Sequence, residues 1–162
     1  SDIRFSSIIS TFVKTEYYDI RKLNIQLSDL NTEVADLGNL PFQSNSILSL
    51  SCMHVVEHCG LGRYGDLVDP KADITAINEL IRVLKHDGKL YFVVPLASNP
   101  RINFNAHRVY SYSQIIEYFS KLHLIEFTLI PDTYKHDGMI TNPSKSIINK
   151  QNYACGCFLF KK

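Results

Sequence analysis

A helix pattern followed directly by an unbroken apolar run most constrains the fold of this chain. Apolar residues recur at three- and four-residue spacing at Ile74, Ile77, Leu80, Ile81 and Leu84. This spacing predicts an amphipathic helix that ends before the His86-Asp87-Gly88 terminator. Residues 89–95 (KLYFVVP) then form an apolar run of strand length, as expected for a strand covered on both faces. Together these two elements predict an α/β sheet packed against helices.

Further elements are predicted on both sides of this pair. Helices are expected over residues 3–12 and 113–122, and strands over 15–20, 33–37, 47–51, 124–130 and 153–160. Strands that alternate with helices favour a mostly parallel sheet with helices on both faces. The two final strands have no helix between them, which favours an antiparallel pair at one edge. No linker or repeat interrupts the pattern, so residues 1–162 are expected to form a single domain.

Composition limits the partners and the compartment. A net charge of +1 gives no electrostatic case for nucleic acid or an anionic membrane. No apolar run approaches the roughly 20 residues that span a bilayer, and the start has no signal-peptide pattern. The four cysteines are too few and too oddly spaced for a disulfide framework. A soluble cytoplasmic domain is expected, whereas the oligomeric state is not set by these features.

Ligand-binding and acid/base groups gather in residues 36–58. Asp36 follows one predicted strand, and His54, Glu57 and His58 follow the next. The carboxyl ends of strands meet at one edge of an open α/β sheet, where ligands bind. Because the last three residues are spaced i, i+3 and i+4, they lie on one face of a helical turn and are expected to point at one centre.

Two motif matches in this region are weak. The cluster fits the H-x-x-E-H signature of a zinc hydrolase, but that signature needs a full helix, and the glycine-rich residues 59–70 follow at once. A metal-dependent hydrolase is therefore a distant alternative. Gly60 to Gly65 match G-x-G-x-x-G, yet no strand leads directly into them and no helix opens at them. A loop covering the pocket is the preferred interpretation.

Three blocks in order resemble the class I S-adenosylmethionine-dependent methyltransferase superfamily, in particular its type 11-like members. The blocks are ADLGNLPFQSNSILSLSCMHVVEH, AINELIRVLKHDGKLYFVVP and NAHRVYSYSQIIEYF. HVVEHCGLGRYGD, FNAHRVYS and YACGCFLF are similar to a poorly characterised branch of unknown function. The resemblance implies a Rossmann-like methyltransferase fold. The family's first strand and its glycine-rich D-x-G-x-G turn are absent from this chain, so the sheet is expected to lack that strand. Either the motif lies upstream of Ser1 or the protein has lost it, and the sequence does not decide between these alternatives.

The resemblance also implies cofactor contacts for S-adenosylmethionine. Asp19 would bind the ribose hydroxyls, and Asp36 with Leu37 would meet the adenine. Ser51 and Cys52 would lie beside the methyl donor. The alternatives are a solvated strand-end carboxylate for Asp19, a turn-forming carboxylate for Asp36 and a buried, inert thiol for Cys52.

The acceptor side follows from the same resemblance. Glu57, His58 and His107 are predicted as catalytic residues, with His107 or His58 removing the acceptor's proton. Some relatives bind a divalent ion through E-x-x-E-H, which predicts a metal set of His54, Glu57, His58 and His107. Imidazole at position 54 would favour a transition metal over magnesium. The alternative is that Glu57 and His58 bond the backbone and fix the loop.

Two further features have mainly structural interpretations. Cys155 and Cys157 lie two residues apart on a predicted strand and point the same way, but a single C-x-C pair favours packing. Arg108 is expected at the surface or in an ion pair. The resulting functional hypothesis is a methyltransferase acting on a small-molecule or glycan-type acceptor. The alternative is a non-catalytic relative that serves as a binding or scaffold protein.

Overall fold

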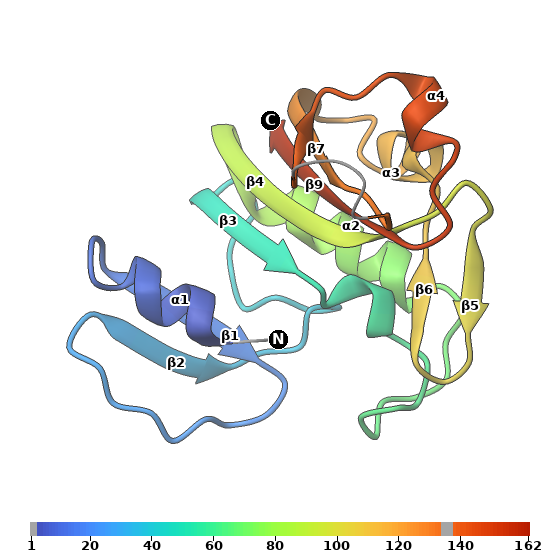
Figure 1. The fold of residues 1–162 in the computed structure, drawn as a ribbon. Coiled ribbons are helices and arrows are strands. Elements are labelled where there is room, and N and C mark those ends of the chain that lie inside the picture. The colour runs from blue at the N-terminus through green and yellow to red at the C-terminus, as the bar shows by residue number, and fades with distance from the viewer. Residues whose placement is uncertain (1–2, 134–137) are drawn as a thin grey trace. The chain divides into compact units, whose positions relative to one another are not determined.

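The computed structural model describes residues 3–133 and 138–162, which divide into two compact units, Ser1–Pro41 and Phe42–Lys162 (Figure 1). We refer to them as the first and second unit. The prediction of a single domain stays a prediction.

The first unit contains one helix and one parallel strand pair. The helix is α1 (Ile3–Ile9), and the strands are β1 (Thr15–Asp19) and β2 (Leu30–Val34). The predicted helix and first strand are confirmed, with a shorter helix. The strand predicted over residues 33–37 lies earlier, because buried Leu30 pairs with Thr15 whereas Asp36 and Asn39 form a turn.

The second unit is built on a five-stranded sheet. Its order is β3 (Ile47–Met53), β4 (Leu84–Leu96), β9 (Ala154–Lys161), β7 (His123–Ile130) and β8 (Ile140–Thr141) (Figure 1). Among the described strands of this sheet, β3 and β4 pair in parallel, and the other neighbours pair antiparallel. Strands β3, β4 and β7 therefore run in one direction, and their carboxyl ends meet at the edge where β9 begins.

The α/β class is confirmed, but the sheet is mixed rather than mostly parallel. The final two strands do pair antiparallel, yet β9 is not at the edge. It lies between β4 and β7, where Cys157 is opposite Val93 on one side and Thr128 on the other. A strand that returns between two others can bond on both sides, which leaves the two-residue β8 as the edge strand on that side.

Only one face of this sheet is fully buried in the described residues. Leu90, Phe92 and Val94 are buried on β4, whereas Tyr91 between them is 41% exposed. The buried face is largely aromatic: Phe92 contacts Phe119, which stacks on Phe160. The expectation that residues 89–95 are covered on both faces is therefore wrong for this unit.

Two longer helices connect the strands as the sequence predicts. The first is α2 (Ala72–Val83), after which β4 begins at once, so the His86-Asp87-Gly88 terminator lies inside the strand rather than at the helix end. The second is α3 (Tyr112–Tyr118), whose cap Ser111 forms a reciprocal capping box with Gln114.

Several short elements were not predicted. They are the 3-10 turn η1 (Val56–His58), the helix α4 (Lys145–Ile148), the strand β8 and a hairpin of β5 (Arg101–Asn103) and β6 (His107–Val109). Strand β8 and helix α4 lie in the long loop before β9, of which residues 134–137 are outside the described part. No helix in the described residues has the length and apolar character needed to cross a bilayer.

Candidate functional site

The predicted His–Glu–His cluster lies just past the carboxyl end of β3. The backbone N–H of His54 donates to the carbonyl of Val93 at 2.9 Å, which fixes the residue beside β4. His54 has a left-handed backbone (φ 53°), and the η1 turn follows two residues later. This sharp exit turns the chain back, so the His54 Nδ1 donates to Glu57 Oε1 at 2.9 Å.

Glu57 is the centre on which the cluster converges. Its side chain is 1% exposed, and the His58 Nε2 lies 3.9 Å from the same Oε1 that accepts from His54. The other carboxylate oxygen, Oε2, is buried and has no hydrogen-bond partner among the described residues. Buried polar atoms are normally paired, so this oxygen makes Glu57 a candidate functional residue.

His58 and His107 lie beside one another on the far side of Glu57. The His58 Nδ1 donates to the carbonyl of Ala106 at 2.7 Å, and the two imidazole centroids are 6.0 Å apart. The His107 Nε2 accepts from the Tyr153 hydroxyl at 3.1 Å and lies 3.3 Å from the Asn103 Nδ2. Hydrogen bonds to Nε2 favour the tautomer of His107 that carries its proton on Nδ1.

The two imidazoles nearest the pocket have opposite tendencies. The hydrogen bond that His54 donates to Glu57 raises the pKa of His54 above its ordinary value, although burial partly opposes this. Burial, followed by the neighbouring His58, lowers the pKa of His107. Relative to ordinary imidazoles, the site therefore stabilises the protonated form of His54 and the neutral form of His107, which is the kind of separation that acid/base chemistry uses.

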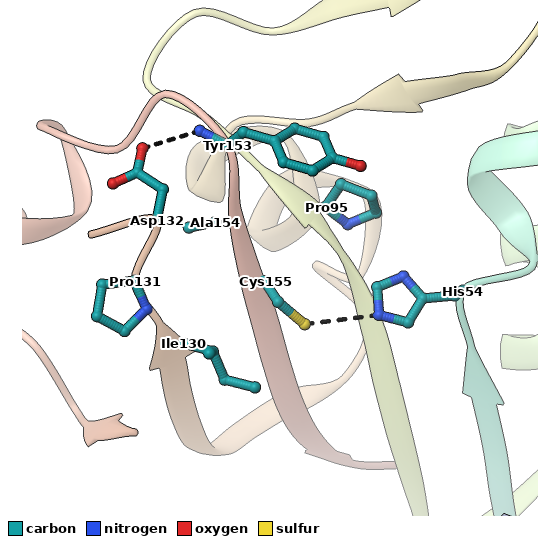
Figure 2. A pocket seen from close by; sticks show the side chains of 8 residues that line it. All are labelled: His54, Pro95, Ile130, Pro131, Asp132, Tyr153, Ala154 and Cys155. Atoms are coloured by element: carbon teal, nitrogen blue, oxygen red, sulfur yellow. Dashed lines mark hydrogen bonds between the residues drawn. The ribbon is translucent and has the colours of Figure 1, made fainter. Parts of the chain in front are cut away.

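A pocket of about 270 Å³ opens at this edge of the sheet. Its walls come from the ends of β3, β4 and β7 and from the start of β9, and are formed by His54, Pro95, Ile130, Pro131, Asp132, Tyr153, Ala154 and Cys155 (Figure 2). The Asp132 Oδ2 accepts from the backbone N–H of Tyr153 at 3.0 Å, which holds the base of that side chain. The Tyr153 hydroxyl thus connects the pocket to His107.

A metal ligand set is not formed by the predicted residues. In the part of the chain that the structure describes, no group of three or more His, Cys, Asp or Glu side chains is arranged to hold a metal ion. His54 and His58 each use Nδ1 in a protein hydrogen bond, and the Nε2 of His54 lies 3.6 Å from the Cys155 Sγ. The metal set His54, Glu57, His58 and His107 stays a prediction.

The predicted ribose and adenine contacts lie in the first unit. Partial burial acts to raise the pKa of Asp19, but hydrogen bonds from Arg21 and Tyr17 outweigh it and bring the pKa below its ordinary value. Asp19 is therefore an ionised hydrogen-bond acceptor. The Asp36 Oδ1 accepts from the backbone N–H of Gly38 at 2.8 Å, the geometry of the turn-forming alternative. The cofactor roles of Asp19, Asp36 and Leu37 stay predictions.

The predicted methyl-donor contacts lie on β3. Ser51 is exposed, whereas Cys52 is buried in the core. Burial raises the pKa of the Cys52 thiol, with a further contribution from Glu57. A neutral, enclosed thiol matches the alternative of an inert packing residue, so Ser51 is the more accessible of the two predicted contacts.

Arg108 forms the ion pair that was one of its two predicted environments. Its Nε lies 3.3 Å from the Asp73 Oδ2, and the same oxygen accepts from the Tyr110 hydroxyl at 3.0 Å. The guanidinium also donates to the carbonyls of Cys59 and Pro70, at the two ends of the glycine-rich loop. Arg108 therefore fixes this loop rather than serving as an acceptor contact.

The loop over residues 59–70 folds as the sequence predicts. No helix opens at its glycines, and Gly60 (φ 71°) approaches the Asp69 carbonyl so closely that a Cβ would lie 2.1 Å from that oxygen. The Tyr64 ring meets the His58 ring edge-on at 5.8 Å between centroids. The loop therefore covers the histidine side of the cluster.

Tyr153, Asn103 and the pocket face of Cys155 were missed as site residues. Asn103 lies on a three-residue strand, which is too short for a periodic signal. Tyr153 directly precedes β9. It reaches the pocket only because β9 pairs with β4, and the sequence does not predict that pairing. The C-x-C spacing draws attention to Cys155, but it cannot predict contact with His54, which lies 101 residues away in the sequence.

Comparison with solved structures shows the fold. The [4+2]-cyclase SpnF superposes with a TM-score of 0.67 at 11% identity, covering 98% of this chain and 70% of that one. The YcgJ protein from Bacillus subtilis gives 0.58 at 16% identity, covering 96% and 84%. A SAM-dependent methyltransferase from Methanosarcina mazei gives 0.54 at 12% identity, covering 99% and 76%.

Sequence comparison gives the family. No curated protein matches the chain. A family profile matches residues 13–140, which is most of the sequence. The chain belongs to the family described as Caenorhabditis protein of unknown function, DUF268.

Proposed function

We propose that this protein is an S-adenosylmethionine-dependent methyltransferase that acts on a small-molecule or glycan-type acceptor. One observation carries the proposal: proton-accepting side chains and a pocket meet at the carboxyl edge of the sheet, in a fold shared with a SAM-dependent methyltransferase. Ligands of open α/β sheets bind at this edge.

The pocket side chains support proton removal from an acceptor hydroxyl. S-adenosylmethionine, when bound, supplies an electrophilic methyl group on its sulfonium sulfur, and Asp19, Asp36, Leu37 and Ser51 are the proposed holders of that cofactor. An acceptor hydroxyl in the pocket lies next to the Tyr153 hydroxyl. Because Tyr153 donates to the His107 Nε2, the acceptor's proton passes to Tyr153 as the Tyr153 proton passes to His107. The low pKa of His107, caused first by burial, keeps its lone pair available.

Methyl transfer is tested with methyl-tritiated S-adenosylmethionine and panels of sugars, phenols and catechols as acceptors. The full-length protein is expected to label at least one acceptor, and His107→Gln is expected to lower the turnover rate by about a hundredfold, within the range for a lost general base. Asn78→Ala on the outer part of α2 serves as a matched control. Labelling that is equal in wild type and H107Q would contradict the role of His107.

A non-catalytic or differently catalytic relative is the second candidate. SpnF is a [4+2]-cyclase on the same fold, so the fold by itself does not fix the chemistry. A cofactor that binds without methyl transfer to any acceptor would favour this candidate. The H-x-x-E-H hydrolase is disfavoured because η1 is a single 3-10 turn of three residues.

A further inference from the structure

Cys155 lies in the wall of the pocket and faces His54. It is the second residue of β9, paired with Pro95 on one side and Ile130 on the other. Figure 2 shows its sulfur directed at the imidazole, and the Sγ lies 3.6 Å from the His54 Nε2. This is hydrogen-bond distance for a thiol donor.

The contact extends into a chain of three groups. The Nδ1 of His54 donates to Glu57, whose carboxylate can only accept, so Nε2 of a neutral ring carries the lone pair and accepts the thiol proton. A carboxylate that orients an imidazole, which in turn bonds a thiol, is the arrangement that activates nucleophiles. The unpaired Glu57 Oε2 is a second observation, because it leaves negative charge close to the imidazolium that forms when the thiol gives up its proton.

Cys157 is a second thiol that forms a hydrogen bond with Cys155. It points to the same side of β9, and a hydrogen bond between the two thiols lowers the pKa of Cys157 to about 7 while it raises the pKa of Cys155. Cys155 therefore keeps its proton until attack, and that proton passes to His54 during the step. Cys155 lines the pocket and Cys157 does not, so a ligand in the pocket meets the Cys155 sulfur.

We propose that Cys155 is a nucleophilic thiol that captures uncharged carbon electrophiles of the α,β-unsaturated carbonyl class, with His54 as proton acceptor and Glu57 as its positioning residue. Pro95, Ile130 and Pro131 give the pocket apolar surface. The lining also includes the Asp132 carboxylate, which disfavours an anion, and none of the described lining residues is Lys or Arg. An uncharged, compact electrophile fits such walls better than an anionic one. The proposal goes beyond methyl transfer and does not rest on it.

The step is a simple addition. The thiol proton of Cys155 moves to the His54 Nε2, and the sulfur electron pair forms a bond to the β-carbon of the electrophile. The carbon–carbon π pair shifts to give an enolate, which takes the proton back from the His54 imidazolium at its α-carbon. The product is a neutral thioether, and no oxidant, reductant or leaving group is involved.

The test uses N-ethylmaleimide as the electrophile, with modified residues located and timed by mass spectrometry. Cys59, whose Sγ donates to the Val55 carbonyl, is the internal control because it is also partly buried and does not line the pocket. At pH 7 Cys155 is expected to react at least about tenfold faster than Cys59, because the His54 imidazole accepts its proton during attack. His54→Asn, a residue type that accepts the left-handed backbone, is expected to remove this advantage.

Three further outcomes decide the assignment. Glu57→Gln is expected to slow Cys155 by about threefold to tenfold and leave Cys59 unchanged, since the imidazole loses its orienting charge. Cys157→Ser is expected to slow Cys155 without moving the label to another residue. Equal rates for Cys155 and Cys59, unchanged Cys155 rates in H54N, or labelling first at Cys157 would each overturn the proposal. Circular dichroism of each variant shows that it is folded.

Discussion

Two carboxylates of the second unit, Glu57 and Asp73, are almost equally buried but have different surroundings. Asp73 is 4% exposed in the first turn of α2, and its Oδ2 forms an ion pair with Arg108 and accepts a hydrogen bond from the Tyr110 hydroxyl. Glu57 is 1% exposed in η1, with one oxygen bonded to a half-exposed histidine and the other unpaired. A fully satisfied buried charge stabilises structure, whereas a half-satisfied one next to titratable groups indicates a reactive site.

The partners of the two carboxylates differ in the same way. Burial, followed by the charge of Asp73, raises the pKa of Tyr110, so this phenol stays a neutral donor at all physiological pH values. Arg108 is permanently charged and also bonds the carbonyls of Cys59 and Pro70. By contrast, His54 is a titratable donor whose pKa is raised by its hydrogen bond to Glu57. Asp73 therefore belongs to the structural scaffold of the unit, and Glu57 belongs to the candidate site.

The largest expected effect is on the scaffold carboxylate. Asp73→Asn leaves the Arg108 charge buried without a counter-ion, so the free energy of unfolding is expected to fall by about 3 kcal/mol. Urea denaturation measures it. Asp87→Asn is the matched control, because its carboxylate pairs with Lys161 at the exposed surface and its positive φ suits Asn. A midpoint for D73N equal to that of D87N would remove the distinction between Asp73 and a surface residue.

A smaller effect on stability is expected at the site carboxylate. Glu57→Gln removes a buried charge but keeps an oxygen that accepts from His54, so the free energy of unfolding is expected to change by less than about 1 kcal/mol. The same urea titration gives this value directly beside that of D73N. If E57Q destabilised the protein as much as D73N, Glu57 would belong to the scaffold as well.

The smallest expected effect is a pH dependence from His54. Its folded-state pKa is raised, first by the hydrogen bond to Glu57, so the protonated ring stabilises the fold. This contribution is fully present below the unfolded histidine pKa of about 6.5 and is lost as the pH rises through the higher folded value. Because half of the ring is exposed, it is expected to be less than about 1 kcal/mol.

NMR titration of the histidine ring signals measures the His54 pKa in wild type and E57Q. The value is expected to fall in the variant, and the loss of stability above pH 6.5 is expected to shrink with it. A His54 pKa that does not change on replacing Glu57 would show that the hydrogen bond does not set the protonation state.

The sequence predicted the site carboxylate better than the scaffold carboxylate for a physical reason. His54, Glu57 and His58 lie within five residues, so one sharp turn brings them together, and local spacing carries that information. Asp73 and Arg108 are far apart in the chain, and their contact depends on how the β5–β6 hairpin packs on α2. Three-residue strands leave no periodic pattern, so the sequence predicts neither the hairpin nor Asp73 as the partner of Arg108.

The sheet shows the same division between local and long-range information. The apolar runs that became β4, β7 and β9 were visible, and so was the helix α2 between β3 and β4. The place of β9 between β4 and β7 was not visible, because it depends on pairing across long separations. That placement puts Tyr153 and Cys155 in the pocket, which is why both were missed as site residues.

The most direct test of the central claim is calorimetric titration of the full-length protein with S-adenosylhomocysteine, the demethylated cofactor product. This measurement needs no knowledge of the acceptor. Saturable binding to one site is expected, with a Kd on the order of 1 μM, about −8 kcal/mol. Binding is expected to weaken in Asp19→Ala and to remain in Glu57→Gln, which lies on the acceptor side. Absence of binding at about 1 mM ligand, a binding free energy weaker than about −4 kcal/mol, would contradict the methyltransferase proposal.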